Sequence, residues 1–468
     1  MLNSICKFLS PIIKVTLFIY LLWHYGIYGI AFYIITAYLL YYVCYKYLHL
    51  HALSIGDYQF VNNDQSYKAV YILELISFDP DKIISDIYHK SFKYFPKLRQ
   101  RLFYYYFDYF FVDAPLDVAK KQIKYDKDII LNSIEEINDY AHKISLLKFN
   151  ENNFMYDIHI VATPNGGGVI MLNFDHVMTD GIGSMGFLNS ISVTKDTHIP
   201  MSFKIPLYAW LYSILCFPYY AIMIAYRHGL YLGKVCDKHS PFKTDKPFTG
   251  ITKPRYSKKY SFAKAQEFYR KMNISFNDLI ISVISVTVSK YYKYYDQYKD
   301  NKKLFMTIPI NVKEIPKDSR NTKMDNQASA VIIEIPIGDS LDNAEFLNKI
   351  KEEVNNTAKN LNLVYAIKFI NNFGNYFLPR YIWDFMINDT LKDVDIQFSN
   401  IAGPSKPIYI GGSEVKDISF VTPIGKHRIF MGVHSYKGEY FINFNADSSI
   451  DCDVDKLVDL IDEVLEKI

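Results

Sequence analysis

Residues 171–185, MLNFDHVMTDGIGSM, contain the residue types and the spacing of a site for general base catalysis. An apolar run typical of a β-strand ends at Asp175, so that His176 is expected where the strand passes into a loop and its side chain can point into a cleft. An unperturbed imidazole has a pKa of about 6.5, which makes histidine the natural general base near neutral pH. Asp180 is placed to brace the loop by pairing with a cation, and Gly181 permits a tight turn. On this motif alone, a structural histidine in a turn is the competing interpretation.

Composition excludes several classes of protein. The chain has 468 residues and a formal net charge of +3, a balance that argues against binding to nucleic-acid phosphates. Its five cysteines are scattered and form neither a CxxC pair nor a Cys/His cluster, so we expect no zinc site and no disulfide framework. We therefore expect no metal and no permanently bound cofactor, and we expect the bulk of the protein to face the cytosol.

The first fifty residues (1–50) form a candidate membrane anchor. Residues 15–45 contain no Asp, Glu, Lys or Arg. A single helix through them would be roughly 46 Å long, whereas the hydrocarbon core of a bilayer measures about 30 Å. A split at residues 24–26, HYG, gives a hairpin of two short pieces, and basic residues on both sides favour a hairpin with both ends in the cytosol. A tilted single span is the alternative.

A second uncharged run, residues 205–226, is interrupted by Pro218. Because proline disfavours a continuous helix across the bilayer, the run either dips into one leaflet or forms a buried core helix. The basic tract that follows, residues 234–259, contains Pro and Gly and is typical of a linker. We therefore assign residues 201–258 to a crossover linker between two lobes.

The rest of the chain alternates strand-like and helix-like segments, which predicts an α/β sandwich built of two similar halves. In the first half (residues 51–200), residues 155–174 predict two strands joined by a Pro-Asn-Gly turn. In the second half (residues 259–468), residues 274–295 predict a long buried helix with Ser275 as its N-cap.

Several segments, in the same order along the chain, resemble the wax ester synthase/diacylglycerol acyltransferase (WS/DGAT) family, which is part of the CoA-dependent acyltransferases with an HxxxD motif. The stretch DHVMTDG is similar to the HHxxxDG motif of that family. FMYDIHIV, ISFNDLIISVI and FSNIAGPSKPIYIGGSEV are similar to its PLW, Asn-Asp and SN-PG segments. KSFKYFPKLRQRL, and IPINV followed by DNQASAVIIEIPIG, resemble two further segments. The resemblance runs from about residue 55 to the C-terminus.

This resemblance implies a two-lobed, chloramphenicol-acetyltransferase-like sandwich with a central tunnel. It implies that His176 is the catalytic base and that Asn277 donates a hydrogen bond to the oxyanion, and the alternative role of Asn277 is to cap or brace its helix. Asp180, Gly181 and Lys313 are expected to support the motif. The residues expected along the tunnel or near the substrates are Asp175, Tyr156, Asp278, Ser399, Asn400 and Gly403.

Three positions depart from the family pattern. Asp175 replaces the first histidine of the HH pair, and its carboxylate would stabilise an imidazolium at His176 and so weaken that base. Tyr156 occupies the place of the tryptophan in the PLW segment, a change that would reshape an acyl pocket. Lys313 replaces an arginine expected to pair with Asp180, which exchanges a bidentate contact for a point charge.

The function that the resemblance implies is a membrane-bound O-acyltransferase. It would transfer a fatty acyl group from acyl-CoA, a co-substrate, to a fatty alcohol or diacylglycerol and so make a wax ester or triacylglycerol. Membrane lipids are expected partners, and the expected location is the membrane of the endoplasmic reticulum with the catalytic part in the cytosol. One alternative is transfer of a short acyl group to a small hydroxylated metabolite. The other is a catalytically inactive, membrane-anchored lipid-binding or scaffold protein of the same fold.

Overall fold

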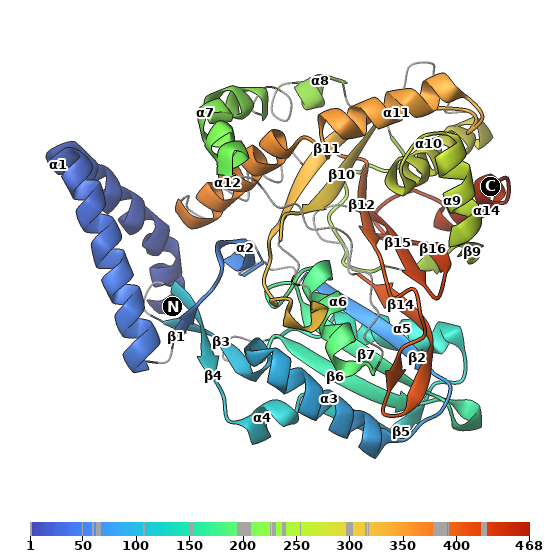
Figure 1. The fold of residues 1–468 in the computed structure, drawn as a ribbon, viewed down its shortest axis with the longest axis horizontal. Coiled ribbons are helices and arrows are strands. Elements are labelled where there is room, and N and C mark those ends of the chain that lie inside the picture. Colours follow the sequence, from blue (N-terminus) through green and yellow to red (C-terminus); the bar gives the residue numbers. More distant parts are fainter. Residues whose placement is uncertain are drawn as a thin grey trace.

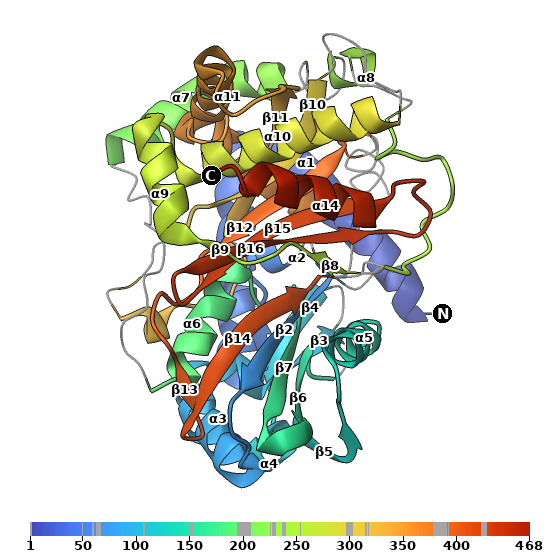
Figure 2. The same ribbon diagram turned by 90° about the vertical axis from the view of Figure 1, so that its right-hand side faces the viewer.

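Two lobes, each built on one mixed β-sheet, make up most of the structure (Figures 1 and 2). This computed structural model describes the chain except for residues 1, 49, 59, 62–66, 106–107, 150–152, 194–206, 225, 227–230, 236–239, 253, 296–302, 314–315, 317, 378–390, 392 and 423–427. One large hydrophobic core fills the C-terminal lobe, and the N-terminal lobe has one core on each face of its sheet. All are rich in the β-branched and aromatic side chains that suit buried strands.

The N-terminal lobe contains a six-stranded sheet. In sheet order its strands are β13 (Tyr409–Ile410), β14 (Ser413–Val421), β2 (Lys68–Leu75), β7 (Gly168–Asp175), β6 (Tyr156–Ala162) and β5 (Ile123–Ile130). Apolar side chains of α3 (Pro80–Tyr94) and α6 (Gly181–Ile191) pack on one face of this sheet, and those of α5 (Ile134–Ser145) pack on the other. β6 and β7 are buried along almost their whole length. β7 reads as a near-continuous apolar run, as is typical of a strand covered on both faces, whereas β6 includes Asp157 and His159.

Smaller elements flank this lobe. They are the three-stranded sheet of β1 (Leu50–Ala52), β4 (Asp108–Asp113) and β3 (Gln100–Tyr105), the helices α2 (Ile55–Tyr58) and α4 (Leu116–Lys120), and the 3-10 turns η1 (Pro96–Arg99) and η2 (Pro164–Gly166). The predicted pair of strands in residues 155–174 is confirmed by β6 and β7, which are joined through η2.

The C-terminal lobe contains the second sheet. Its strands, in order, are β11 (Ala328–Pro336), β10 (Lys303–Asn311), β12 (Ile396–Ile401), β15 (Ile429–Tyr436), β16 (Glu439–Ala446) and β8 (Arg255–Tyr256), with β9 (Tyr260–Ser261) also paired to β16. Its helices are α9 (Phe262–Lys271), α10 (Phe276–Tyr294), α11 (Ala344–Asn356), α12 (Leu361–Phe377) and α14 (Val454–Leu465). Ser275 is the N-cap of α10, as predicted, because its hydroxyl accepts a hydrogen bond from the N–H of Asp278.

The N-terminal sheet includes strands from the C-terminal half of the sequence, so the two lobes do not simply follow one another along the chain. β13 and β14 lie in the C-terminal half of the sequence, yet β14 pairs with β2 inside the N-terminal sheet (Figure 2). Gly411 and Gly412, both with positive φ, turn the chain between β13 and β14, where the sequence reads as one continuous strand. β8, within the predicted linker, belongs to the C-terminal sheet.

A second crossing brings C-terminal residues to the histidine motif. β10 and β11 are antiparallel neighbours, and the segment between them, residues 312–327, leaves the C-terminal sheet and reaches the N-terminal lobe. Its 3-10 turn η4 (Ser319–Asn321) packs beside α6, the helix that follows the motif. A segment that connects two strands of the C-terminal lobe therefore contacts the histidine motif and the helix that follows it.

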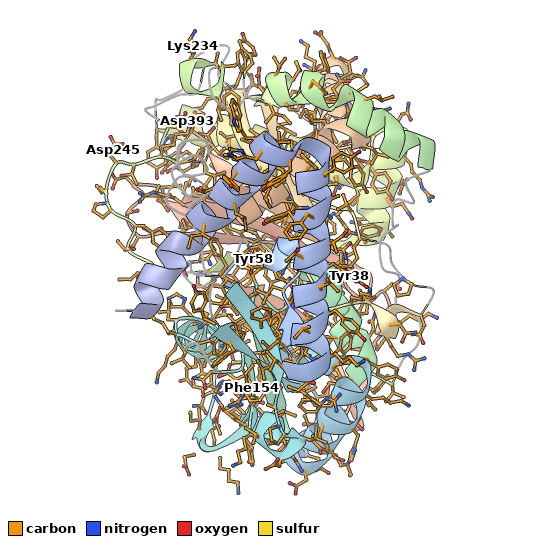
Figure 3. The ribbon with its side chains drawn as sticks, turned by 90° about the vertical axis from the view of Figure 1, so that its left-hand side faces the viewer. Tyr38, Tyr58, Phe154, Lys234, Asp245 and Asp393 are labelled. Carbon is orange, nitrogen blue, oxygen red and sulfur yellow. The ribbon has the colours of Figure 1, made fainter. Side chains whose placement is uncertain are left out.

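The N-terminal helix α1 (Leu2–Leu48) bends at Gly26, within the HYG triplet at which the sequence predicts a split. Gly26 has φ +53°, and the rings of Phe18 and Tyr33 meet across the bend with their centroids 5.7 Å apart. The two arms diverge from the bend (Figure 3), and the helix projects from the body (Figure 1). Trp23 and Tyr28, on either side of the bend, are more than 80% exposed.

Among the residues that the structure describes, no single helix is both long and apolar enough to cross a bilayer. Taken together, α9 and α10 have the length and the composition needed to cross a bilayer, but the two helices meet at an angle of 93°. α10, however, contributes many buried residues to the core of the C-terminal lobe.

The predicted crossover linker contains α7 (Leu207–Ile224) and α8 (Leu232–Val235). Leu215 and Ile222 of α7 are more than 70% exposed, so the interpretation of this run as a buried core helix is wrong for its described residues. Several basic residues that follow α7 are paired with carboxylates of the C-terminal half. These pairs are Lys246 with Asp451, Lys258 with Glu466 and Lys259 with Asp417.

Candidate active site

His176 lies immediately after the last residue of β7. Its backbone N–H donates to Tyr67 O at 2.6 Å, and the N–H of Met178 donates to Asp175 O at 2.9 Å, which closes a tight turn. The imidazole is partly buried and stacks on the ring of Phe60, with centroids 4.1 Å apart and planes inclined by 15°. Strand, turn and aromatic contact together fix the direction of this side chain.

The two ring nitrogens of His176 have different surroundings. Nδ1 lies 3.0 Å from Oδ1 of Asn326, a residue of the segment between β10 and β11. Nε2 makes no hydrogen bond to any residue that the structure describes. One nitrogen is therefore anchored, and the other is open to exchange a proton with a substrate.

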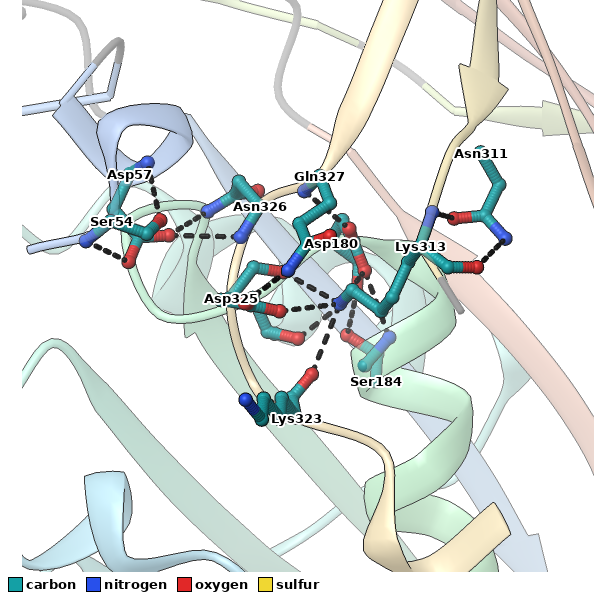
Figure 4. Close-up of polar contacts among 12 residues, drawn as sticks. Ser54, Asp57, Asp180, Ser184, Asn311, Lys313, Lys323, Asp325, Asn326 and Gln327 are labelled. Atoms are coloured by element: carbon teal, nitrogen blue, oxygen red, sulfur yellow. Dashed lines mark hydrogen bonds and ion pairs between the residues drawn. The ribbon is translucent and has the colours of Figure 1, made fainter. Parts of the chain in front are cut away.

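Asp180 ties the histidine loop to the other lobe (Figure 4). Its Oδ1 accepts from the N–H of Gly183 at 2.9 Å, which caps α6, and also from Lys313 Nζ at 3.0 Å. Its Oδ2 accepts from the N–H of Gln327 at 3.1 Å. Lys313 also contacts Oδ1 of Asp325 at 3.0 Å and donates to two backbone carbonyls. The structure thus brings together the predicted pair of Lys313 and Asp180, and both side chains are buried.

Asp175, predicted near the tunnel, is the last residue of β7. It is buried, and its Oδ1 accepts from the N–H of Val177 at 3.0 Å. Its partner across the strands is Lys68, also buried, whose Nζ has no hydrogen-bond partner among the described residues and lies 4.2 Å from the ring centroid of Phe149. Burial lowers the pKa of Lys68 to about 8, and the charges of Asp175 and Asp157 oppose that fall. Asp175 therefore lies next to a cation, Lys68, that no pattern in the sequence predicts.

Three further predicted residues meet near the end of β12. Asn400 Nδ2 donates to Oδ1 of Asn277 at 2.6 Å, and Ser399 precedes Asn400 in β12. Ile401 follows them, and its Cδ1 would lie 3.4 Å from a Cβ built on Gly181. The end of β12 therefore lies against the histidine motif. In the described contacts Asn277 is bonded to Asn400, not to His176.

The remaining three residues predicted along the tunnel are Tyr156, Asp278 and Gly403, and each has a close contact within the protein. Tyr156 is fully buried in the N-terminal core and donates its hydroxyl to Leu98 O at 2.8 Å, and burial raises its pKa. Asp278 completes the capping box of α10 by accepting from the N–H of Ser275. Gly403 passes so close to β15 that a Cβ there would lie 2.1 Å from Ser435 O. A place for these three residues along a tunnel stays a prediction.

Sequence reasoning missed three residues that contact the motif, namely Phe60, Lys97 and Asn326. It also missed Asp57, which bonds to Lys97 and Asn326. Lys97 Nζ donates to the carbonyls of Val177 and Met178, both at 2.9 Å, and to Asp57 Oδ2 at 3.0 Å. Burial lowers the pKa of Lys97, and Asp57 opposes that fall. Asn326 lies in DNQASAVIIEIPIG, a segment in the family resemblance, but no local pattern links it to a histidine 150 residues earlier.

Two further findings bear on ligands. Within the described part of the chain, no cluster of three or more His, Cys, Asp or Glu side chains could hold a metal ion. A pocket of about 270 Å³ lies on the C-terminal lobe, where β10, β11 and α11 line it with mostly charged side chains. His176 is not among its lining residues, and the predicted tunnel between the lobes stays a prediction.

The architecture is that of two-lobed acyltransferases. The wax ester synthase/diacylglycerol acyltransferase from Marinobacter aquaeolei VT8 superposes with a TM-score of 0.59 at 12% identity, covering 89% of this chain and 98% of that one. The trichothecene 15-O-acetyltransferase from Fusarium sporotrichioides superposes with a TM-score of 0.62 at 10% identity, covering 89% and 94%. At these identities the likeness shows the fold, and the predicted two-lobed fold is confirmed.

Sequence comparison finds similarity to one family. Residues 324–468 match the family model of the WS/DGAT C-terminal domain. A curated relative, wax ester synthase/diacylglycerol acyltransferase 8 from Arabidopsis thaliana, is 19% identical over 394 residues, which are 73% of this chain and 79% of the relative. These matches confirm the resemblance to the WS/DGAT family, and they support the prediction of an acyl-CoA-dependent O-acyltransferase that acts on lipids.

Proposed function

We propose that this chain is a membrane-bound acyltransferase that transfers a fatty acyl group from acyl-CoA to a fatty alcohol or diacylglycerol. The observation that carries the proposal is the state of His176, whose Nδ1 is anchored by Asn326 while its Nε2 has no partner among the described residues. The loop that bears it is fastened to the opposite lobe through Asp180 and Lys313. A histidine held in this way is suited to a proton transfer between two bound substrates.

The proposed reaction is a direct acyl transfer. His176 Nε2 accepts the proton of the alcohol as its oxygen attacks the thioester carbonyl. The tetrahedral intermediate collapses, the C–S bond breaks, and the imidazolium returns the proton to the departing CoA sulfur, so that ester and free CoA are formed without an acyl-enzyme. Asp180 keeps the loop in place and takes no proton.

Asn277 Nδ2 is the proposed donor to the oxyanion. Because Asn400 donates to the Oδ1 of Asn277, the Nδ2 group of Asn277 is turned away from Asn400. Asn277 is also exposed, and Ile401, next to Asn400, lies beside Gly181 of the histidine motif. Losing such a donor typically lowers kcat by about a hundredfold or more.

The membrane part of the proposal is supported by α1. Its exposed side chains include many large apolar ones, and residues 15–45 contain no charged side chain. Fatty alcohols and diacylglycerol partition into bilayers, so an attached enzyme meets its acceptor there. Acyl-CoA would approach from the water side, through a channel between the lobes. The proposed location is the endoplasmic reticulum membrane, with both lobes in the cytosol.

The test uses the full-length protein in phosphatidylcholine vesicles. Palmitoyl-CoA is supplied with hexadecanol or dioleoylglycerol, and acetyl-CoA is supplied with a water-soluble alcohol, while free CoA and ester are measured together. The expected result is equimolar CoA and ester from palmitoyl-CoA with at least one lipophilic acceptor. Ester from the acetyl-CoA pair alone would favour the short-chain alternative. Lipid binding without ester from any pair would identify an inactive lipid-binding protein.

A further inference from the structure

Asn326 is bound in a way that determines which end of its side-chain amide faces His176. Its Nδ2 lies 2.7 Å from Oδ1 of Asp57 and 2.6 Å from the backbone O of His176. A carboxylate and a carbonyl only accept hydrogen bonds, so both contacts require the NH2 end of the amide. The other end, Oδ1, is therefore the atom that lies 3.0 Å from His176 Nδ1.

This orientation selects one tautomer of the neutral imidazole. An amide oxygen only accepts, so Nδ1 must carry the hydrogen in order to donate to Asn326. The lone pair of the neutral ring is then on Nε2, the nitrogen without a partner among the described residues. The opposite tautomer would place two lone pairs against each other at this contact.

Asp57 is itself held rigidly. It is 2% exposed, its Oδ2 accepts from Lys97 Nζ at 3.0 Å, and its Oδ1 also accepts the backbone N–H of Asn326 at 3.0 Å (Figure 4). Gly56 approaches Asn326 so closely that a Cβ on Gly56 would lie 1.8 Å from Asn326 O. With its acceptor atoms occupied in this way, Asp57 leaves the amide of Asn326 a single favourable orientation.

We propose that Asp57 and Asn326 are positioning residues that keep the proton of neutral His176 on Nδ1 and the basic lone pair on Nε2. The inference rests on the proposed role of His176 as the base and adds two residues to that site. The inference also assigns α2, which carries Asp57, to the active site, although α2 lies far from the histidine motif in the sequence. Neither residue takes part in the proton transfer itself.

The first variant is Asn326→Ala, compared with Asn173→Ala. Asn173 is an equally buried control, because its Nδ2 also bonds one carboxylate, Asp157, and one backbone carbonyl, Ile144 O, without a contact to His176. We expect Asn326→Ala to lower kcat about a hundredfold with KM within about twofold. Asn173→Ala should leave kcat within about twofold, because it removes only structural hydrogen bonds.

The second variant is Asp57→Asn. Because asparagine has nearly the same size and shape as aspartate, this variant is expected to fold like the native protein. Lys97 requires an oxygen, so the new NH2 group would face the N–H and NH2 of Asn326, donor against donor. We expect at least a tenfold loss of kcat. The 15N shifts of His176, assigned by difference from His176→Ala, should show a protonated Nδ1 in the native protein and a mixture of tautomers in both variants.

Two outcomes would overturn the inference. One is a kcat within twofold of the native value in Asn326→Ala or Asp57→Asn while His176→Ala is inactive. The other is a native 15N spectrum with the hydrogen on Nε2. Full turnover by His176→Ala would instead remove the proposed base, and so distinguishes failure of the function from failure of the positioning pair.

Discussion

Lys313 and Asp180 place two opposite charges inside the protein, where each would be costly alone. Both side chains are less than 10% exposed, and the ammonium group also contacts the carboxylate of Asp325 and two carbonyls. A buried pair of this kind fixes geometry more than it adds stability, but removing one partner leaves an uncompensated charge. In place of a bidentate arginine contact, the lysine makes several single contacts.

Lys313→Met should therefore destabilise the fold as well as the site. We expect the free energy of unfolding, from urea titration, to fall by about 3 kcal/mol, because the Asp180 carboxylate stays buried without its cation. The double variant Lys313→Met/Asp180→Asn should recover part of this loss. Equal stability of the single variant and the native protein would mean that the pair is not coupled to folding.

The sequence could predict these local contacts better than the long-range ones. His176, Asp180 and their turn lie within five residues, so spacing alone indicates a common loop. Asn326 and Asp57 meet although 269 residues separate them, and nothing local requires that. A motif marks the positions of Asp278 and Gly403 without stating that the first completes a helix cap and the second packs on a strand.

Among the elements, β14 and β15 enclose an unusual histidine. His434 of β15 is fully buried, and the rings of Phe420 and Phe441 flank it. Neither ring nitrogen has a hydrogen bond of ordinary geometry to a residue that the structure describes. Burial lowers the pKa of His434 to about 4, and the backbone of Ile401 opposes that fall only in part. This packing depends on the insertion of β14 into the other sheet, which the sequence did not predict.

The expected consequence is a loss of stability in acid. Between about pH 6.5 and pH 4 the unfolded chain binds a proton at His434 that the folded protein does not, so stability falls as the pH falls, by about 3 kcal/mol from this group. His434→Leu should lose less stability than the native protein between pH 7 and pH 4.5 in urea titrations. Identical pH dependence of the two proteins would contradict a buried neutral imidazole.

At the scale of the whole molecule, α1 projects from the lobes (Figure 1), yet the residues that follow it reach the site. Its second arm is followed by β1 and then by α2, which carries Asp57. The bend at Gly26 could be predicted from the length of the uncharged run and its HYG triplet, since one straight helix would be too long for a bilayer. The path of the chain from α1 to the active site could not be predicted, because it depends on tertiary contacts of the four-residue helix α2.

Replacing Trp23, Tyr28 and Phe32 of α1 by serine tests membrane attachment. All three side chains are exposed and apolar, so we expect at least a tenfold loss of binding to phosphatidylcholine vesicles in flotation. The matched control replaces Ile130, Ile134 and Leu146, which are exposed elsewhere on the N-terminal lobe. Similar losses in both variants would argue against α1 as the attachment site.

Turnover by the His176→Ala protein is the most direct test of the account. Free CoA and ester should be measured together, with palmitoyl-CoA and the best lipophilic acceptor, at equal amounts of folded protein. The account predicts that both products fall about a thousandfold or more, while vesicle binding and the urea midpoint match the native protein. Ester formation within tenfold of the native rate would contradict His176 as the base.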